Sequence, residues 1–166
     1  MNDTATIFRE GMSRLGAAVN LVTTDGPEGR HGMTASAVCS ITDQPPTLLV
    51  CVNRQNRSHD RFNANGKLCV NVLAGRHEAL ATAFASRGSE DRFSGDTWIR
   101  LATGAPVLES AVVAFDCRIV ERKVIGTHSV FYAQVEATRL GAEPAEALVW
   151  FDRRFHPLTA RMPEKV

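Results

Sequence analysis

A hydroxyl-rich segment, residues 32–42, is the first place where the residue types of this chain suggest binding chemistry. It reads GMTASAVCSIT and places Thr34, Ser36 and Ser40 among small residues in what otherwise looks like a core strand. Small side chains let a flat ring approach the backbone, and hydroxyl and N–H groups can then hydrogen-bond the polar edge of such a cofactor. Strand propensity explains the same composition, so an ordinary Ser/Thr-rich strand is the alternative.

A second polar segment, residues 53–58, follows an apolar run and leads into a predicted helix. It reads NRQNRS. A helix N-terminus offers free N–H groups and a favourable dipole to a phosphate, and Arg54 or Arg57 could add a charge-assisted contact. The alternative is a solvated loop in which Ser58 caps the helix.

A turn histidine and an Arg-Phe pair complete the candidates. His128 follows Gly126-Thr127 at a predicted β turn, where an imidazole could lie beside the ring of a bound cofactor. Arg92 and Phe93 lie in a polar loop. A surface histidine and a loop anchor are the respective alternatives.

Familiar catalytic and cofactor motifs are missing from the sequence. It contains no GxGxxG, P-loop or GxSxG pattern, and its histidines are not paired at metal-ligand spacing, so we expect no metal site. Lys and Arg total 19 against 18 Asp and Glu, a net charge of +1. This balance argues against a protein that binds nucleic acid or an acidic membrane.

The cysteines and the N-terminus bear on the compartment. There is no CxxC pair, and Cys39, Cys51 and Cys69 lie in apolar runs, which predicts buried, reduced thiols suited to a reducing environment. The N-terminus lacks the pattern of a signal peptide. No apolar run approaches the roughly 18 residues of a membrane helix. We therefore expect a cytoplasmic protein.

Short β segments must position the candidate residues. Strands are predicted over residues 18–24, 31–42, 47–52, 67–73, 111–124, 127–140 and 147–151, and helices over 4–15, 58–65 and 77–86, with 87–106 mostly loop. Strands joined by short turns favour an antiparallel barrel over a parallel sheet. With 166 residues and no visible linker, we expect a single domain over residues 1–166.

Taken together, these segments resemble the short-chain flavin reductase family, which has a split-barrel FMN-binding fold. The resemblance extends from Phe8 to about Leu158. It rests on the blocks FREGMSRLGAAVNLVTTDG, GMTASAVCSITDQPPTLLVCVNR, GKLCVNVL, DRFS followed by Trp98, GTHSVFY and VWFDRRFHPL. Two branches are most similar: the reductase component of 4-hydroxyphenylacetate 3-monooxygenase and the flavin reductase of the pyrimidine-utilisation pathway.

The resemblance implies a mainly β fold, a split β-barrel with a few short helices, assembled as a homodimer with flavin near the interface. It implies an NAD(P)H:flavin oxidoreductase that prefers NADH and transfers hydride to FMN or FAD. The reduced flavin would leave for a separate flavin-dependent monooxygenase. Two alternatives stay open. One is a flavoprotein with tightly bound FMN that acts directly on another substrate, and the other is a non-catalytic flavin-binding module.

Roles can be carried onto the matching positions. The residues that would line the isoalloxazine and ribityl chain are Thr34, Ala35, Ser36, Ala37 and Ser40. The residues near the ribityl and phosphate would be Asn53 and Ser58, with Arg92 as a further phosphate or adenylate contact and Phe93 as a packing contact. His128 would lie on the nicotinamide side as the catalytic residue. Phe155, with His156, would help to close the pocket.

At one position the sequence departs from the family pattern. Many members have S-x-T in the phosphate region, whereas this chain has Ser58-His59-Asp60. An ionised Asp60 cannot donate a hydrogen bond and would repel a phosphate. Either Asp60 caps the helix and points away, or Ser58 and an arginine hold the phosphate.

Overall fold

A computed structural model of the chain describes residues 3–86, 91–142 and 146–159. Its helical elements are α1 (Thr4–Ser13), α2 (His59–Asn65), the 3-10 turn η1 (Gly75–His77) and α3 (Glu78–Ala85). Its strands are β1 (Ala17–Ala18), β2 (Asn20–Thr24), β3 (His31–Ala35), β4 (Val38–Asp43), β5 (Pro46–Asn53), β6 (Lys67–Val72), β7 (Trp98–Arg100), β8 (Pro106–Leu108), β9 (Val113–Ile125), β10 (His128–Leu140), β11 (Glu146–Phe151) and β12 (Arg154–Thr159). The fold is mainly β, as predicted.

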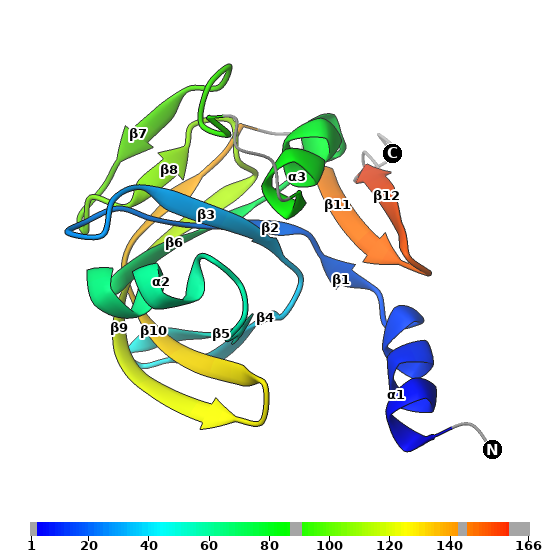
Figure 1. The fold of residues 1–166 in the computed structure, drawn as a ribbon. Coiled ribbons are helices and arrows are strands. Elements are labelled where there is room, and N and C mark those ends of the chain that lie inside the picture. The colour runs from blue at the N-terminus through cyan, green and yellow to red at the C-terminus, as the bar shows by residue number, and fades with distance from the viewer. Residues whose placement is uncertain (1–2, 87–90, 143–145, 160–166) are drawn as a thin grey trace.

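The largest sheet of the described residues closes on itself as a split barrel (Figure 1). Its seven strands lie in the order β3-β2-β6-β9-β10-β5-β4, and every pairing is antiparallel. β3 and β4 are therefore the two edges of the sheet, yet only residues 36 and 37 separate them in the chain. So short a link can join the two edges only if the sheet curls until they meet. The split predicted from the family resemblance lies at this link.

The prediction of one continuous strand over residues 31–42 is therefore wrong. The chain leaves β3 at Ala35 and begins β4 at Val38 on the opposite edge of the barrel. The backbone turns between them, because the Val38 N–H donates to the Ser36 carbonyl at 3.0 Å. Period-two patterning could not reveal this break, since both halves are rich in strand-forming residues.

The two largest apolar cores of the described residues lie on the two faces of the sheet, and a smaller cluster contains Cys69, Ala105, Val107 and Ala114. The first fills the barrel, and the second packs between the sheet, α3 and β11. The barrel core contains Val22, Met33, Ala35, Leu48, Val50, Val52, Phe62, Leu68, Val70, Cys117, Phe131 and Ala133. The second contains Val19, Leu21, Leu73, Ala81, Phe84, Leu108, Ala111 and Leu148. β2 supplies neighbouring residues to both, which explains why all five of its residues are buried.

A small three-stranded sheet, β1-β11-β12, covers the end of the barrel near α3 (Figure 1). The predicted strand 18–24 is divided at Val19, whose N–H donates to the Leu148 carbonyl of β11 at 2.8 Å. β12 is not predicted, and the β7–β8 ribbon lies in the segment predicted as mostly loop. Residues 87–90 of that segment lie outside the described residues. The helices predicted over 58–65 and 77–86 are confirmed.

Helix α1 lies apart from the barrel (Figure 1). Its N-cap is Asp3, whose carboxylate accepts the Ala5 N–H at 2.7 Å. The helix ends at Ser13, earlier than predicted. It is tied to the β11–β12 turn, because Arg153 Nη2 lies 2.6 Å from Glu10 Oε2.

The four cysteines differ in exposure. Cys69 and Cys117 are buried and Cys51 is half-buried, but Cys39 is exposed on β4, so the expectation of a buried thiol is wrong for Cys39. Its side chain lies on an edge strand that no neighbouring strand covers on one side. Within the described part of the chain, no helix is both long enough and apolar enough to cross a membrane.

Candidate functional site

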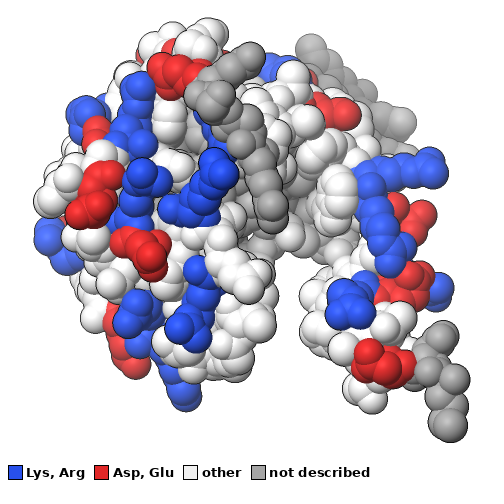
Figure 2. Space-filling model, in the orientation of Figure 1, with Lys and Arg blue, Asp and Glu red and all other residues white. Residues whose placement is uncertain are grey.

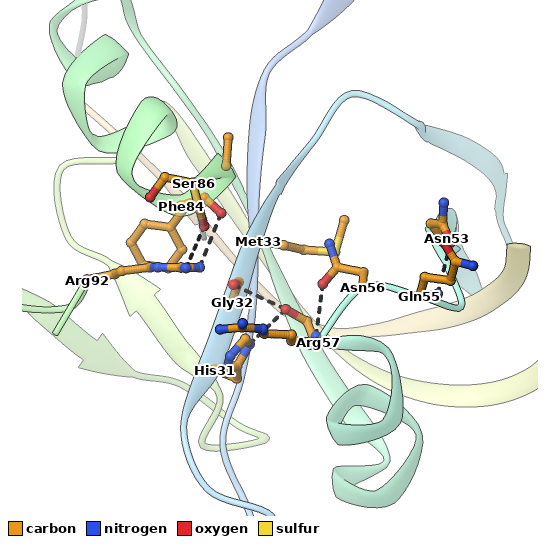
Figure 3. Close-up of a pocket in the computed structure, with 12 residues that line it drawn as sticks. His31, Gly32, Met33, Asn53, Gln55, Asn56, Arg57, Phe84, Ser86 and Arg92 are labelled. Carbon is orange, nitrogen blue, oxygen red and sulfur yellow. Dashed lines mark hydrogen bonds between the residues drawn. The ribbon is translucent and has the colours of Figure 1, made fainter. Parts of the chain in front are cut away.

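A cavity of about 420 Å³ opens beside β3. β3 forms one wall, the loop before α2 forms the second, and the end of α3 with the following loop forms the third (Figure 3). The residues that line it are His31, Gly32, Met33, Asn53, Gln55, Asn56, Arg57, Ser58, Phe84, Ala85, Ser86 and Arg92. This volume lies within the range of small-ligand sites, about 300–1,000 Å³.

The back wall of the cavity depends on Gly32. A Cβ at this position would lie 2.8 Å from Phe84 Cε1 and 3.2 Å from Thr23 Cγ2, so only glycine lets the Phe84 ring lie against β3. Behind the wall, Phe84 packs edge-on against Phe93, with ring centroids 5.1 Å apart. The Arg30 guanidinium covers the Phe93 ring at 4.4 Å from its centroid. Phe93 therefore packs behind the cavity, against the second core, and is not among the residues that line it.

Ser58 links the loop before α2 to β3, and these two segments meet at the floor of the cavity. Its hydroxyl donates to the Gly32 carbonyl at 3.2 Å and lies 2.7 Å from His31 Nδ1. The residue is 1% exposed. Both contacts tie the start of α2 to β3, so this hydroxyl is already engaged within the protein (Figure 3).

The charge of the cavity is basic. Arg57 and Arg92 line it, and among the residues that the structure describes no Asp or Glu is part of the lining. Arg92 is held in place by the carbonyls of Phe84 and Ser86. Figure 2 shows Lys and Arg side chains spread over the face of the barrel that carries β3 and α2. Such a cavity favours an anionic ligand group.

His31 is the titratable group of the cavity. Burial lowers its pKa, and the nearby guanidinium groups of Arg61, Arg92 and Arg57 lower this pKa further. The neutral imidazole is therefore favoured when no anion is present.

Asp60 points away from the cavity. Its side chain is 96% exposed, and its Oδ1 lies 2.7 Å from His59 Nδ1. His59 Nε2 in turn lies 2.8 Å from Ser129 Oγ on β10. The order Asp-His-Ser matches that of a hydrolase triad, but the Ser129 side chain is fully buried, so a substrate cannot reach its hydroxyl. This chain of contacts ties α2 to β10.

The residues predicted to contact the ring lie next to the cavity and outside its lining. Ser36, Ala37 and Ser40 are exposed at the split of the barrel. Ala35 is buried in the barrel core. The Thr34 hydroxyl donates to the Ala81 carbonyl at 2.6 Å and so anchors α3 to β3.

His128 lies on the strand that neighbours the cavity. It is the register partner of Asn53, which lines the cavity, and it is exposed. Its Nδ1 lies 2.9 Å from Thr127 Oγ1. Phe155 lies elsewhere: it packs on Trp150 at a centroid distance of 4.9 Å, against the second core.

Of the predicted site residues, Asn53, Ser58 and Arg92 thus line one cavity. Sequence reasoning missed His31, although it lies one residue before the segment that was singled out. It also missed Met33, Gln55, Asn56, Phe84, Ala85 and Ser86 as lining residues. Their convergence depends on contacts across the fold, such as the one between His31 and Ser58, 27 residues apart.

The lining suits a phosphate-bearing aromatic cofactor. Its guanidinium groups suit a phosphate, its amides suit a polyhydroxyl chain, and Met33 and Phe84 offer apolar surface to a ring. Among the described residues, no cluster of three or more His, Cys, Asp or Glu could hold a metal ion. Split barrel and basic cavity together define the class as a flavin-binding β-barrel.

The comparisons with known proteins agree. The model of the flavin reductase like domain matches residues 12–159. The chain is 53% identical to the FMN reductase (NADH) RutF of Variovorax paradoxus over 154 residues, which are 92% of this chain and 85% of that protein. The chain belongs to the flavin reductase-like domain family.

Solved structures show the same fold. A candidate flavin reductase from Haemophilus somnus 129PT superposes with a TM-score of 0.89 at 42% identity, covering 95% of this chain and 100% of that one. The styrene monooxygenase flavin reductase SMOB from Pseudomonas putida S12 gives 0.83 at 26% identity, covering 95% and 99%.

Proposed function

We propose that this chain is an NADH-dependent flavin reductase. FMN is its flavin substrate, and the reduced flavin serves a separate monooxygenase. The observation that carries the proposal is the cavity beside β3 with Arg57 and Arg92 in its lining, in a chain 53% identical to an FMN reductase (NADH). The likeness to a styrene monooxygenase flavin reductase supports the role in a two-component system.

The phosphate half of the flavin is assigned to the cavity. Arg57 and Arg92 supply the positive charge, and Asn53 and Asn56 supply amide groups for the ribityl chain. Because the Ser58 hydroxyl is engaged by Gly32 and His31, its role shifts from direct phosphate contact to holding the cavity floor.

The ring is assigned to the exposed residues at the split of the barrel, Ser36, Ala37 and Ser40, beside the cavity. Bound flavin supplies the hydride-accepting chemistry. The protein needs only to orient the two substrates and keep them close. His128, next to Asn53, is assigned to the nicotinamide side.

The functional unit is proposed to be a homodimer of one-domain chains. Helix α1 leaves apolar side chains uncovered: Ile7, Phe8, Met12 and Leu15 are 59%, 64%, 47% and 58% exposed. Ile41 of edge strand β4 is exposed as well. Exposed apolar surface of this kind is typical of a protein interface, and a second copy would also cover the open side of the ring site. For the compartment we propose the cytoplasm, because free thiols suit a reducing environment.

An NADH oxidation assay with FMN, FAD and riboflavin in parallel tests the function. Consumption of NADH that depends on added flavin is expected, with FMN as the best substrate. Turnover that needs no added flavin would instead favour a flavoprotein with tightly bound FMN. No NADH oxidation with any flavin would leave a non-catalytic binding module.

A further inference from the structure

The hydrogen bonds of His31 fix which of its nitrogens carries a proton. The Gly32 carbonyl can only accept, so we assign the Ser58 hydroxyl proton to the 3.2 Å contact between them. His31 Nδ1, 2.7 Å from the same oxygen, must then donate. The neutral ring therefore has an unprotonated Nε2, which is the atom that gains a proton when the imidazole becomes charged.

The charged groups around His31 come from three parts of the chain. Arg57 belongs to the loop before α2, Arg61 to α2 itself, and Arg92 to the loop after α3, and all three lower the His31 pKa in addition to burial. On the same parts of the chain, the carboxylates of the described residues are engaged elsewhere or point away. Asp91 pairs with Arg30 at 3.5 Å, and Asp60 is exposed.

A basic cavity of this kind holds its histidine neutral only while no anion is present. A phosphate dianion placed among these guanidinium groups reverses the local potential and favours the imidazolium. Protonated Nε2 then becomes an additional charged donor on the cavity wall.

We propose that His31 is a proton-coupled ligand of the flavin phosphate: binding of the phosphate and protonation of His31 Nε2 stabilise each other. The identity of the ligand as FMN rests on the proposed function. The coupling itself depends only on the negative charge of the phosphate. Linkage makes the effect reciprocal. If the phosphate favours the protonated ring, then lowering the pH must tighten phosphate binding.

The expected measurement is proton uptake on binding. Calorimetric titration of the protein with FMN at pH 7, in two phosphate-free buffers of different ionisation enthalpy, gives the number of protons taken up. We expect a net uptake of up to about one proton and an affinity that rises by up to about tenfold per unit of pH as the pH falls from 8.5 to 6.5. Riboflavin, which lacks the phosphate, should show neither effect.

The matched variants are His31→Asn and His128→Asn. An asparagine amide at position 31 can still donate to Ser58, so the floor of the cavity is retained while the titrating group is lost. His31→Asn should lose most of the uptake and of the pH dependence. The phosphate itself, whose second pKa is about 6, should contribute a small proton release in both proteins, because the basic cavity favours its dianion. His128→Asn should keep the wild-type proton count.

Equal uptake and equal pH dependence in wild type and His31→Asn would overturn the proposal. If FMN binds with uptake but NADH is not oxidised, the coupling stands and the proposed reductase activity fails. If FMN does not bind, inorganic phosphate serves as the probe in an NMR titration of the histidine rings. A rise in the His31 pKa with added phosphate supports the coupling, and an unchanged pKa refutes it.

Discussion

Asn53 and His128 face each other as register partners at the ends of β5 and β10. The pairing places the turn histidine next to a residue that lines the basic cavity. The adjacent backbone hydrogen bond also holds His128 in place: the Arg54 N–H donates to the Thr127 carbonyl at 2.9 Å. His128 is therefore held next to the cavity that is assigned to the flavin phosphate, and a nicotinamide beside it would have to extend from there to the ring site for hydride transfer.

His128→Ala should raise the apparent KM for NADH more than that for FMN. Loss of one hydrogen bond or ring contact, worth about 1 kcal/mol, corresponds to roughly a fivefold change. Steady-state kinetics with each substrate varied in turn measures the two constants. Gln134→Ala, on the same strand, is the control. An equal effect on both KM values, or none, would remove His128 from the nicotinamide side.

Ser36→Tyr should block flavin binding. Ser36 is exposed in the two-residue link between the barrel edges, where a phenol would occupy the space assigned to the ring. Fluorescence quenching of added FMN measures the affinity. Thr138→Tyr, at another exposed strand position, should bind FMN like the wild type. Unchanged affinity in Ser36→Tyr would place the ring elsewhere.

Much of the fold could be predicted from the sequence because each long strand has its own local signature. In β9, Val113, Phe115, Cys117 and Ile119 recur at period two, and the turn predicted at Gly126 does separate β9 from β10. The division of residues 31–42 could not be predicted in the same way. Strand propensity describes each residue locally, whereas the break exists because β3 and β4 lie on opposite edges of one sheet.

The candidate site could be predicted only in part for a similar reason. Asn53 and Ser58 were found because a polar segment follows an apolar run there, and the role of Arg92 was implied by the family resemblance. Their detailed roles depend on distant partners. Ser58 looks like a phosphate ligand in the sequence, and only the fold brings His31 and Gly32 to its hydroxyl.

Gly32→Ala should weaken both the fold and FMN binding. The new Cβ would meet the Phe84 ring at 2.8 Å, and moving that ring disturbs the cavity wall and the second core together. Overpacking of this kind costs about 1–3 kcal/mol. Thermal unfolding and FMN titration report the two effects. Gly11→Ala, where a Cβ meets nothing within 4 Å, should leave both unchanged or raise the melting temperature slightly. A wild-type melting temperature in Gly32→Ala would show that Phe84 moves freely.

Phe8→Glu should shift the protein from dimer to monomer. Phe8 is 64% exposed on α1, and a buried glutamate without a partner would be costly at an apolar interface. Light scattering after size exclusion measures the mass. Ala79→Glu, exposed on α3, should remain dimeric. A monomeric wild type, or a dimeric Phe8→Glu, would exclude α1 from the interface.

The wild-type protein should lose stability as the pH falls below about 6.5, and His77 should account for part of the loss. His77 is 5% exposed, and its Nδ1 accepts the Ala74 N–H at 3.0 Å, so this nitrogen must stay unprotonated. Its pKa is lowered, first by burial and then by Arg76. The unfolded chain therefore binds more protons than the folded one between the lowered pKa and the ordinary value. Within that window stability rises with pH and is lost on acidification.

The variant that checks this is His77→Asn, whose amide oxygen can accept the same N–H without titrating. Its melting temperature should be lower than that of the wild type at pH 7.5, because the imidazole packing is lost, but it should fall less between pH 7.5 and 5.5. The difference should be a few degrees, since 1 kcal/mol corresponds to roughly 2–4 °C in a chain of this size. Part of the loss of stability at low pH should remain in His77→Asn, because burial lowers the pKa of His31 as well. The exposed His128→Asn should follow the wild type. If His77→Asn and the wild type lose stability in parallel, the Ala74–His77 contact does not control the acid response.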